Sequence, residues 1–327
     1  MARGERGDGE TASPFRGEES TVRESGESNG RRWAIVLASH GGVAMQPELK
    51  PWLGRNVPGQ YRRVLGARSR FQHTLDRTMQ VTSPTRTVVV VARGHREAWA
   101  QIGARDPGMV LVQPRNLGTA PEVFLSLTYI RARDPEGTVL ISPSDHIVVS
   151  EERYLREVLY AVRAAEQLPT KLVLLASRPE SPQAEYGWIM PDHQLLRFGS
   201  RTIRAVKTFI KRPEPPLARL AYASGALWNT CIMAGKVDAF WNMGRNVLPN
   251  MMVLFERLTE AIDTPQEAEV LRTMYARMPS LSFSRDLLEH AAGETAMMEM
   301  MEMSGLWWSD RERSCADPPD AASVVRL

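Results

Sequence analysis

Residues 33–60, WAIVLASHGGVAMQPELKPWLGRNVPGQ, decide the fold class of this chain. They open with an apolar run, residues 33–38, which is short enough for a buried strand and is followed at once by polar and glycine residues. A strand that leads through a glycine turn into a further element is the arrangement with which α/β domains present backbone N–H groups to a phosphate. The residues at which a nucleotide is expected to approach this backbone are Ser39, Gly41 and Gly42.

Strands and helices then alternate as far as residue 176. Residues 87–92, TVVVVA, form a β-branched run that is typical of a buried parallel strand. Further apolar runs predict strands at 110–112, 138–141 and 171–176. Apolar residues at helical spacing predict helices at 71–79, 97–102 and 151–167, and another helix is expected to begin with Pro121. The alternation predicts an α/β fold with a mostly parallel, doubly wound sheet.

The pattern changes after residue 178. Short strand-like pieces are predicted at 186–189, 203–210 and 226–228, joined by proline-rich turns, 213–216 among them. Helices are predicted at 237–258, 267–277 and 284–291. The methionine-rich run 297–308 has interleaved glutamates and no neighbouring Cys or His, so we expect a flexible strand or a packing surface rather than a metal site.

Composition sets the broad class of the protein. The 327 residues are 43% hydrophobic and 24% charged, as in ordinary globular proteins, and a net charge of +3 is too small to argue for nucleic-acid binding. No apolar run approaches the ~20 residues that a membrane helix needs. Two distant cysteines predict reduced thiols and a cytoplasmic location. The expected organisation is a disordered tail without a secretory signal at 1–31, one domain at 32–313 and a C-terminal tail at 314–327.

Eight motifs, in this order, resemble those of the sugar-phosphate nucleotidyltransferases, and specifically of the mannose-1-phosphate guanylyltransferase group. They are WAIVLA with its glycine loop, QPRNLGTAPEV, LISPSDHIV, EYGWI, TFIKRP, ALWNT, FSRDLLEH and WWSD, which together span residues 32–310. The resemblance implies a Rossmann-like nucleotide-diphospho-sugar transferase fold with a mixed, mostly parallel central sheet flanked by helices. It also implies a reaction in which a sugar-1-phosphate oxygen attacks the α-phosphorus of a nucleoside triphosphate and pyrophosphate leaves.

The resemblance assigns roles to two aspartates and to one further segment. Asp145 of LISPSDHIV matches the family's metal-binding aspartate and Asp310 of WWSD matches the second, so both are candidate catalytic residues and Mg²⁺ ligands. The alternative for Asp145 is a loop carboxylate that caps the following segment. The family segment that contacts the base and ribose is matched by Gln113, Asn116, Gly118 and Thr119. The alternative for this segment is a plain strand-to-helix turn.

The sugar-phosphate side of the family site is matched by Tyr186, Gly187, Arg212 and Asn229. Arg212 keeps the charge of the lysine in the family's F-x-E-K-P motif, with a different geometry. Lys211 replaces the glutamate of that motif, and a cation cannot accept a hydrogen bond from a sugar hydroxyl. Two smaller departures are Leu117, where the group commonly carries arginine, and Cys231, where it carries glycine.

The largest departures fall in the opening stretch. The family loop reads G-G-x-G-T-R-L and is followed by P-K-Q, whereas here Ala44 stands in the place of the arginine and Gly59 in the place of the lysine. One such preorganised cation commonly contributes about 10²–10³ in rate. Other nearby cations, at a different spacing, are Lys50, Arg55, Arg62 and Arg63.

Two hypotheses follow from the family resemblance, beside a third idea of a nucleic-acid-binding module, which predicts strongly salt-dependent binding to duplex or single strands. The first is a magnesium-dependent nucleotidyltransferase that joins a nucleoside triphosphate, with GTP favoured, to a sugar 1-phosphate, with mannose 1-phosphate favoured. The missing cations leave open whether its turnover is impaired. The second is a catalytically inactive relative that serves as a nucleotide-sugar sensor or regulatory partner, and it is motivated by Ala44, Gly59 and Lys211. The expected partners are small-molecule substrates and neither membranes nor nucleic acid, and a homo-oligomer is left open.

Overall fold

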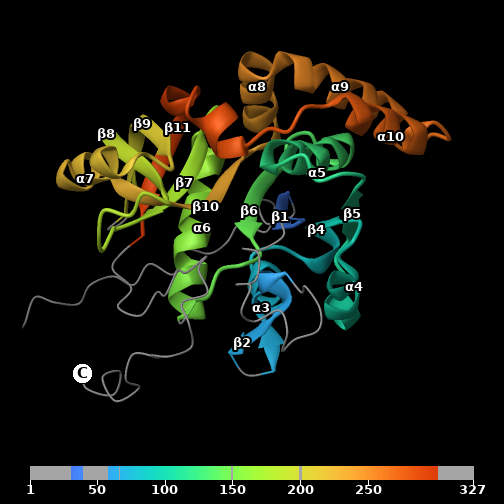
Figure 1. Ribbon diagram of the computed structural model, residues 1–327, viewed down its shortest axis with the longest axis horizontal. Coiled ribbons are helices and arrows are strands. Elements are labelled where there is room, and N and C mark those ends of the chain that lie inside the picture. Colours follow the sequence, from blue (N-terminus) through green and yellow to red (C-terminus); the bar gives the residue numbers. More distant parts are fainter. Residues whose placement is uncertain (1–30, 40–57, 66, 149, 199–200, 301–327) are drawn as a thin grey trace, which may run out of the picture.

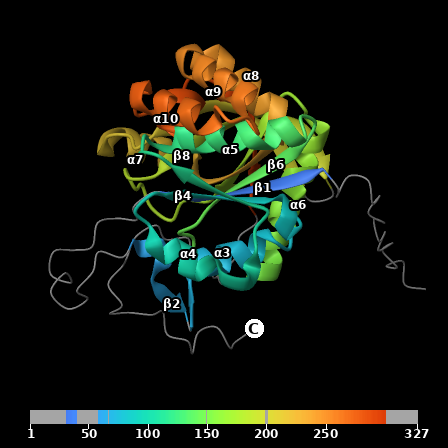
Figure 2. The same cartoon turned by 90° about the vertical axis from the view of Figure 1, so that its right-hand side faces the viewer.

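The computed structural model describes residues 31–39, 58–65, 67–148, 150–198 and 201–300. The described strands form a nine-stranded sheet, in the order β5-β4-β1-β6-β10-β7-β11-β9-β8, and a small hairpin of β2 (Arg63–Leu65) and β3 (Arg68–Ser69). Figure 2 shows the sheet between two layers of helices. The predictions that lie outside the described residues are those for Gly41, Gly42, Ala44, Asp310 and the segments 1–30 and 301–327.

The first half of the sheet is parallel. β1 (Arg32–Ala38) lies between β4 (Thr87–Ala92) and β6 (Thr138–Pro143), and β5 (Met109–Gln113) lies outside β4. Residues 88–91 are fully buried because helices cover both faces of the sheet, which is why these strands are apolar at successive positions instead of alternating. The predicted mixed, mostly parallel α/β sheet is confirmed.

The second half of the sheet is mixed. β7 (Leu172–Ser177) and β11 (Thr295–Glu299) run parallel to each other, whereas β8 (Gly187–Phe198), β9 (Arg201–Lys211) and β10 (Leu227–Lys236) add antiparallel pairings. Since β10 pairs with both β7 and β8, the strands β10, β7, β11, β9 and β8 close into a ring. This ring brings the start of β8, the start of β10 and the end of β9 together.

Two sets of helices cover the two faces of the sheet (Figures 1 and 2). One face carries α3 (Arg70–Thr78), α4 (Arg96–Ile102) and α6 (Glu151–Gln167). The other carries α5 (Thr119–Arg133), α8 (Val237–Val247), α9 (Pro249–Ala261) and α10 (Glu267–Arg277). α7 (Pro215–Ala223) packs at the side of β8. In the described part of the chain, no helix is long and apolar enough to cross a membrane.

Several boundaries differ from the sequence predictions, and three of the differences involve proline. Pro121 was predicted to be the first residue of its helix but is the third residue of α5. It is tolerated there because the N–H groups of the first turn have no partner within the helix, so the missing N–H of proline costs no hydrogen bond. The predicted helix 237–258 is divided, because Pro249 lacks an N–H and its ring excludes continuation of α8. Residues 213–216 were predicted only as a turn, whereas Pro215 opens α7.

The strands β8 and β9 are also longer than predicted, at 12 and 11 residues. Residues 192–194 of β8 are exposed. An exposed end of a hairpin needs no apolar face, so its sequence does not show the alternation that marks a half-buried strand.

Candidate functional site

The carboxyl ends of the parallel strands meet at one edge of the sheet, where α/β folds bind ligands. Ser39 directly follows β1, and Asp145 lies two residues beyond the end of β6. Leu37 is in register with Pro143, and the Ser144 N–H donates to the carbonyl of Leu37 at 3.2 Å. The structure therefore places Ser39 and Asp145 at the ends of neighbouring strands.

The backbone around Asp145 is held by two arginines of α3. Arg70 donates to the Asp145 carbonyl at 3.5 Å, and the buried Arg77 donates to the His146 carbonyl at 3.2 Å. Burial lowers the pKa of the Arg77 guanidinium, whose charge also lies over the Tyr154 ring at 5.4 Å. These contacts fix the turn and leave the Asp145 side chain 38% exposed.

In the described part of the chain the Asp145 carboxylate forms no ion pair with a lysine or arginine, although Arg70 and Arg77 contact the backbone beside it. Its Oδ1 lies 3.9 Å from Nε2 of His146. Burial lowers the pKa of His146 to about 4, so this imidazole is neutral near pH 7. The carboxylate is thus available to an outside cation. Mg²⁺ can be held by one or two carboxylates together with phosphate oxygens, so Asp145 fits as one ligand, although the described residues contain no ready three-ligand cluster.

Gln113 belongs to a buried network below the end of β1. Its Nε2 donates to Ser39 Oγ at 2.6 Å, and its Oε1 accepts from the Tyr275 hydroxyl at 3.2 Å. The Ser39 N–H in turn donates to Glu122 Oε1 at 3.1 Å. Ser39 and Glu122 are fully buried and Gln113 nearly so. Both ends of the Gln113 amide therefore have partners inside the protein, and its role toward a base stays a prediction.

A second group of polar side chains converges on the carbonyl of Ala38, the last residue of β1. Tyr61 Oη donates to it at 2.8 Å and Gln60 Nε2 at 3.3 Å, and His95 Nδ1 lies 3.2 Å away. The short turn Gly59–Tyr61 carries two of these residues and starts with the buried Gly59. The position that the family's lysine would occupy is therefore packed close to the end of β1.

The other predicted nucleotide residues form the turn into α5. The Gly118 N–H donates to Asn116 Oδ1 at 3.1 Å, and Thr119 Oγ1 accepts from the Phe283 N–H at 2.8 Å. Gly118 has a φ of 91°, and a Cβ at this position would lie 2.4 Å from the Leu281 carbonyl oxygen. Only glycine fits here. The turn is therefore docked on residues 281–283, with Asn116 exposed.

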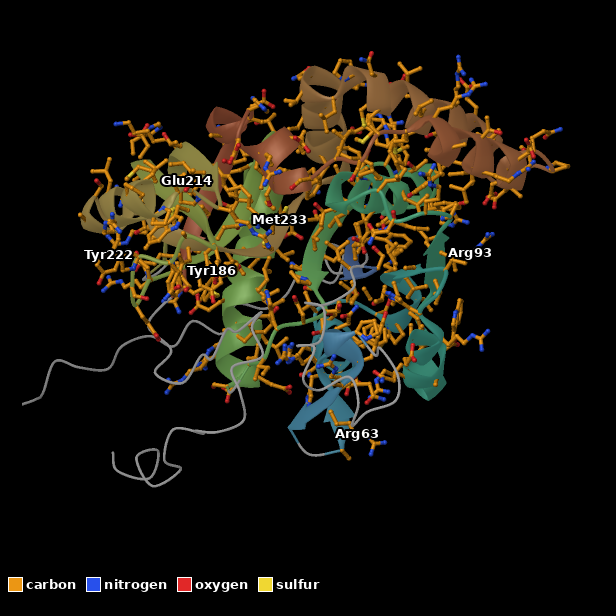
Figure 3. The ribbon with its side chains drawn as sticks, in the orientation of Figure 1. Arg63, Arg93, Tyr186, Glu214, Tyr222 and Met233 are labelled. Carbon is orange, nitrogen blue, oxygen red and sulfur yellow. The ribbon has the colours of Figure 1, made fainter. Side chains whose placement is uncertain are left out.

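The four predicted sugar-phosphate residues come together at the ring of strands. Asn229 of β10 and Gly187 of β8 are in register, and the Arg212 N–H donates to the Tyr186 carbonyl at 3.1 Å. The Tyr186 ring packs on Trp228, with ring centroids 4.7 Å apart. Figure 3 shows Tyr186 in the half of the molecule that also holds Tyr222 of α7.

The two clusters share one edge of the sheet. β10 runs antiparallel to β6, with Met233 opposite Ile141, so β10 begins at the edge where β6 ends. Asn229 at the start of β10 and Asp145 after β6 therefore lie toward the same edge. Met233 is labelled in Figure 3, between the two halves of the sheet.

Sequence reasoning missed the residues that support these clusters. Glu122, Tyr275 and His95 contribute to the networks at the end of β1, and Glu289 accepts a hydrogen bond from the Lys211 N–H. The sequence contained a hint for Glu122, because it is a charged residue in the first turn of an otherwise apolar helix. Tyr275 had none, because it lies 162 residues from its partner Gln113.

Comparison with known proteins gives a family match over most of the chain. The model of the family described as Nucleotidyl transferase matches residues 41–310. The Xanthan biosynthesis protein XanB of Xanthomonas campestris pv. campestris (strain B100) is 29% identical over 268 residues, which are 79% of this chain and 54% of that protein. The mannose-1-phosphate guanylyltransferase of Escherichia coli is 23% identical over 188 residues, 55% of this chain and 38% of that protein. The chain spans about half the length of the curated relatives that it matches.

Solved structures share the fold. A crystal structure described as mannose-1-phosphate geranyltransferase from Thermus thermophilus has a TM-score of 0.69 at 24% identity. The aligned residues are 86% of this chain and 76% of the chain in that structure. One described as mannose-6-phosphate isomerase from Helicobacter pylori has a TM-score of 0.66 at 19% identity and covers 85% and 99%. At these identities the likeness is one of architecture.

Proposed function

Because the chain belongs to the nucleotidyl transferase family, we propose that it joins a nucleoside triphosphate to a sugar 1-phosphate and releases pyrophosphate. The favoured pair is GTP and mannose 1-phosphate, and a relative that carries the name mannose-1-phosphate guanylyltransferase supports it. The observation that carries the proposal is the shared sheet edge: Asp145 lies at one point of it and Asn229 and Gly187 at another. A transfer reaction requires two substrates side by side.

The chemistry requires two anionic substrates to approach each other. A bound magnesium ion would neutralise phosphate charge and stabilise the leaving pyrophosphate. Asp145 would hold this ion, together with Asp310. Arg212, whose side chain is exposed, would contact the phosphate of the sugar, and Tyr186 and Asn229 would orient its ring. Ser39 and the glycine loop after it would bind the triphosphate.

A second candidate function is a catalytically inactive nucleotide-sugar sensor or regulatory partner. The observation that favours it is the chemistry at the end of β1, where Tyr61 and Gln60 supply neutral donors to the Ala38 carbonyl. Gly59 supplies no charge at the position of the family's lysine. A protein that binds both substrates but lacks cations for the developing charge would bind without turnover.

The two candidates are separated by a product assay with the full chain. Purified protein, Mg²⁺ and each of GTP, ATP, UTP, CTP and dTTP are combined with mannose 1-phosphate, glucose 1-phosphate or the corresponding uronic acid 1-phosphates, and pyrophosphate and nucleotide sugar are quantified. The transferase proposal expects both products in equal amounts for at least one pair. Nucleotide binding by calorimetry without product from any pair would contradict it and support the sensor.

The proposal includes one nucleotidyltransferase domain at residues 32–313 and a cytoplasmic location, where nucleoside triphosphates and sugar phosphates are available. Its partners are these small molecules, and a homo-oligomer is compatible with it.

A further inference from the structure

Three residues form a row across the ring of strands. Asn229 of β10 is in register with Gly187 of β8, and Gly187 is in register with Lys211 of β9. Side chains directly opposite one another in neighbouring strands project from the same face of a sheet. The row therefore places a buried amide, whose Oδ1 accepts a hydrogen bond from the Cys231 N–H, then a gap and then an ammonium group at the sugar-phosphate end of the site.

The gap in the row is fixed by packing. A Cβ on Gly187 would lie 3.3 Å from Asn229 Cβ and 3.4 Å from Phe209 Cζ. These contacts are tight, so a larger residue would displace Asn229 or the Phe209 ring.

The charge of Lys211 is not used within the described part of the protein. Its half-buried side chain has neither an ion pair nor a hydrogen bond among the described residues. The neighbouring carboxylate of Glu289 accepts the backbone N–H of Lys211 instead. The adjacent Arg212 is exposed, so two cationic side chains follow each other at this end of β9.

An ammonium group donates hydrogen bonds and accepts none. It contributes most when an anion reaches it, and a half-buried position screens that attraction less than an exposed one. A sugar 1-phosphate brings one phosphate, for which Arg212 is the proposed partner. A neutral sugar ring would leave Lys211 without an anion, whereas a ring that carries a carboxylate would supply one.

We infer that Lys211 shifts the preference of this site from the neutral mannose 1-phosphate to a sugar 1-phosphate with a second anionic group on the ring, of the hexuronic acid class. The inference rests on the proposed function, because it names the substrate class of the same site. In this arrangement Lys211 pairs with the ring carboxylate, and Arg212 contacts the phosphate.

The test compares sugars that differ only at C6. Calorimetry measures the binding of glucuronic acid 1-phosphate and glucose 1-phosphate, and of mannuronic acid 1-phosphate and mannose 1-phosphate, to the full chain. In at least one series the uronic acid is expected to bind about tenfold more tightly. Equal affinities in both series, tighter binding of the neutral sugars, or no binding of any of the four would overturn the inference.

Variants of β9 assign the preference to Lys211. Lys211→Glu is expected to abolish or reverse the preference, and Lys211→Gln, which keeps a polar side chain without charge, to remove it. The matched control is Lys207→Glu, an exposed position on the same strand with the same change of charge, which should leave the ratio unaltered. If Lys211→Glu weakens both sugars equally, Lys211 binds their common phosphate and the inference fails. Absence of nucleotide sugar from every pair would refute the proposed activity and leave this binding ratio interpretable.

Discussion

At the scale of single residues, two left-handed backbone positions lie where the sugar phosphate is proposed to bind. Among the described residues, non-glycine positions with positive φ include Arg212 at 50° and Cys231 at 61°. Both lie close to Gly187. Arg212 directly follows Lys211, which is paired with Gly187 in the sheet. The Cys231 N–H donates a hydrogen bond to Oδ1 of Asn229, the other partner of Gly187, at 3.2 Å. A left-handed backbone costs an L-residue roughly 1–2 kcal/mol, and such strain concentrates at functional sites.

Gly118→Ala tests the docking of the turn before α5. Gly118 and Gly225 both have positive φ, but a Cβ on Gly118 meets the Leu281 carbonyl oxygen at 2.4 Å, whereas one on Gly225 meets nothing within 4 Å. We expect Gly225→Ala to lower the free energy of unfolding by about 1 kcal/mol, from backbone strain alone. Gly118→Ala should cost about 3 kcal/mol or more, because the clash adds to the strain. Equal losses in urea titrations of the two variants would show that residues 281–283 do not pack on this turn.

His146 predicts a pH dependence of stability. Its pKa is about 4 in the folded protein, mainly because of burial, against 6.5 in the unfolded chain. The folded pKa is lowered, so the unfolded state takes up a proton first as the pH falls. The contribution of His146 is therefore lost between about pH 6.5 and pH 4, and amounts to about 3 kcal/mol over that range.

The measurement for His146 is the free energy of unfolding from pH 7.5 to pH 4, in the wild type and in His146→Gln. Other groups titrate in both proteins, so the difference between the two curves isolates His146. We expect the variant to be less stable at pH 7.5 and to lose less stability on acidification. Parallel curves would mean that the imidazole is not held neutral by burial.

At the scale of elements, the end of β9 depends on a segment that lies about 80 residues further along the chain. Residues 283–288 form a π-helical turn, and Glu289 follows it with its carboxylate on the Lys211 N–H. A hydrogen bond to a charged acceptor is among the stronger ones in proteins. The turn thereby fixes the backbone from which Lys211 and Arg212 project.

Glu289→Ala should release this end of β9. We expect the Lys211 amide proton to exchange about tenfold faster and sugar 1-phosphate to bind several-fold more weakly, because the acceptor of the N–H is lost. Glu289→Gln keeps an acceptor oxygen and should stay near the wild type in both measurements. Hydrogen exchange by NMR and calorimetry provide the two readouts. Should both variants behave alike, the charge of Glu289 rather than its hydrogen bond would be what matters.

The elements show which parts of a fold a sequence predicts. The strand 87–92 and the helices 151–167 and 267–277 have the predicted bounds, because β-branched runs and helical periodicity follow from burial in regular layers. The outer part of the β8–β9 hairpin was not predicted, because exposed pairing leaves no apolar pattern. Pro249 could have predicted the division between α8 and α9, but the apolar residues continue at helical spacing on both sides of it, so a single helix was predicted.

At the scale of the whole molecule, the topology determines how the predicted site residues are grouped. The rule that ligands bind at the carboxyl ends of parallel strands placed Ser39 and Asp145 from sequence, since Ser39 directly follows one apolar run and Asp145 lies in the short segment after another. Motif resemblance named Tyr186, Gly187, Arg212 and Asn229, which the ring of strands then brings together. The pairing of Gln113 with Ser39 and Tyr275 could not be predicted, because it depends on how separate layers pack.

The sheet edge at Asp145 is the proposed place of nucleotidyl transfer. The most direct measurement is the rate of pyrophosphate release, with Mg²⁺ and the best substrate pair, for the wild type, Asp145→Asn and Asp106→Asn. Asp106 serves as the control because it is exposed and lies just before β5, at the amino ends of the parallel strands. Its φ of 43° is one that asparagine tolerates. If Asp145 holds the metal ion, the rate falls by at least about 10²-fold in Asp145→Asn, because metal binding is weakened, and stays unchanged in Asp106→Asn. Wild-type rates in Asp145→Asn would contradict it.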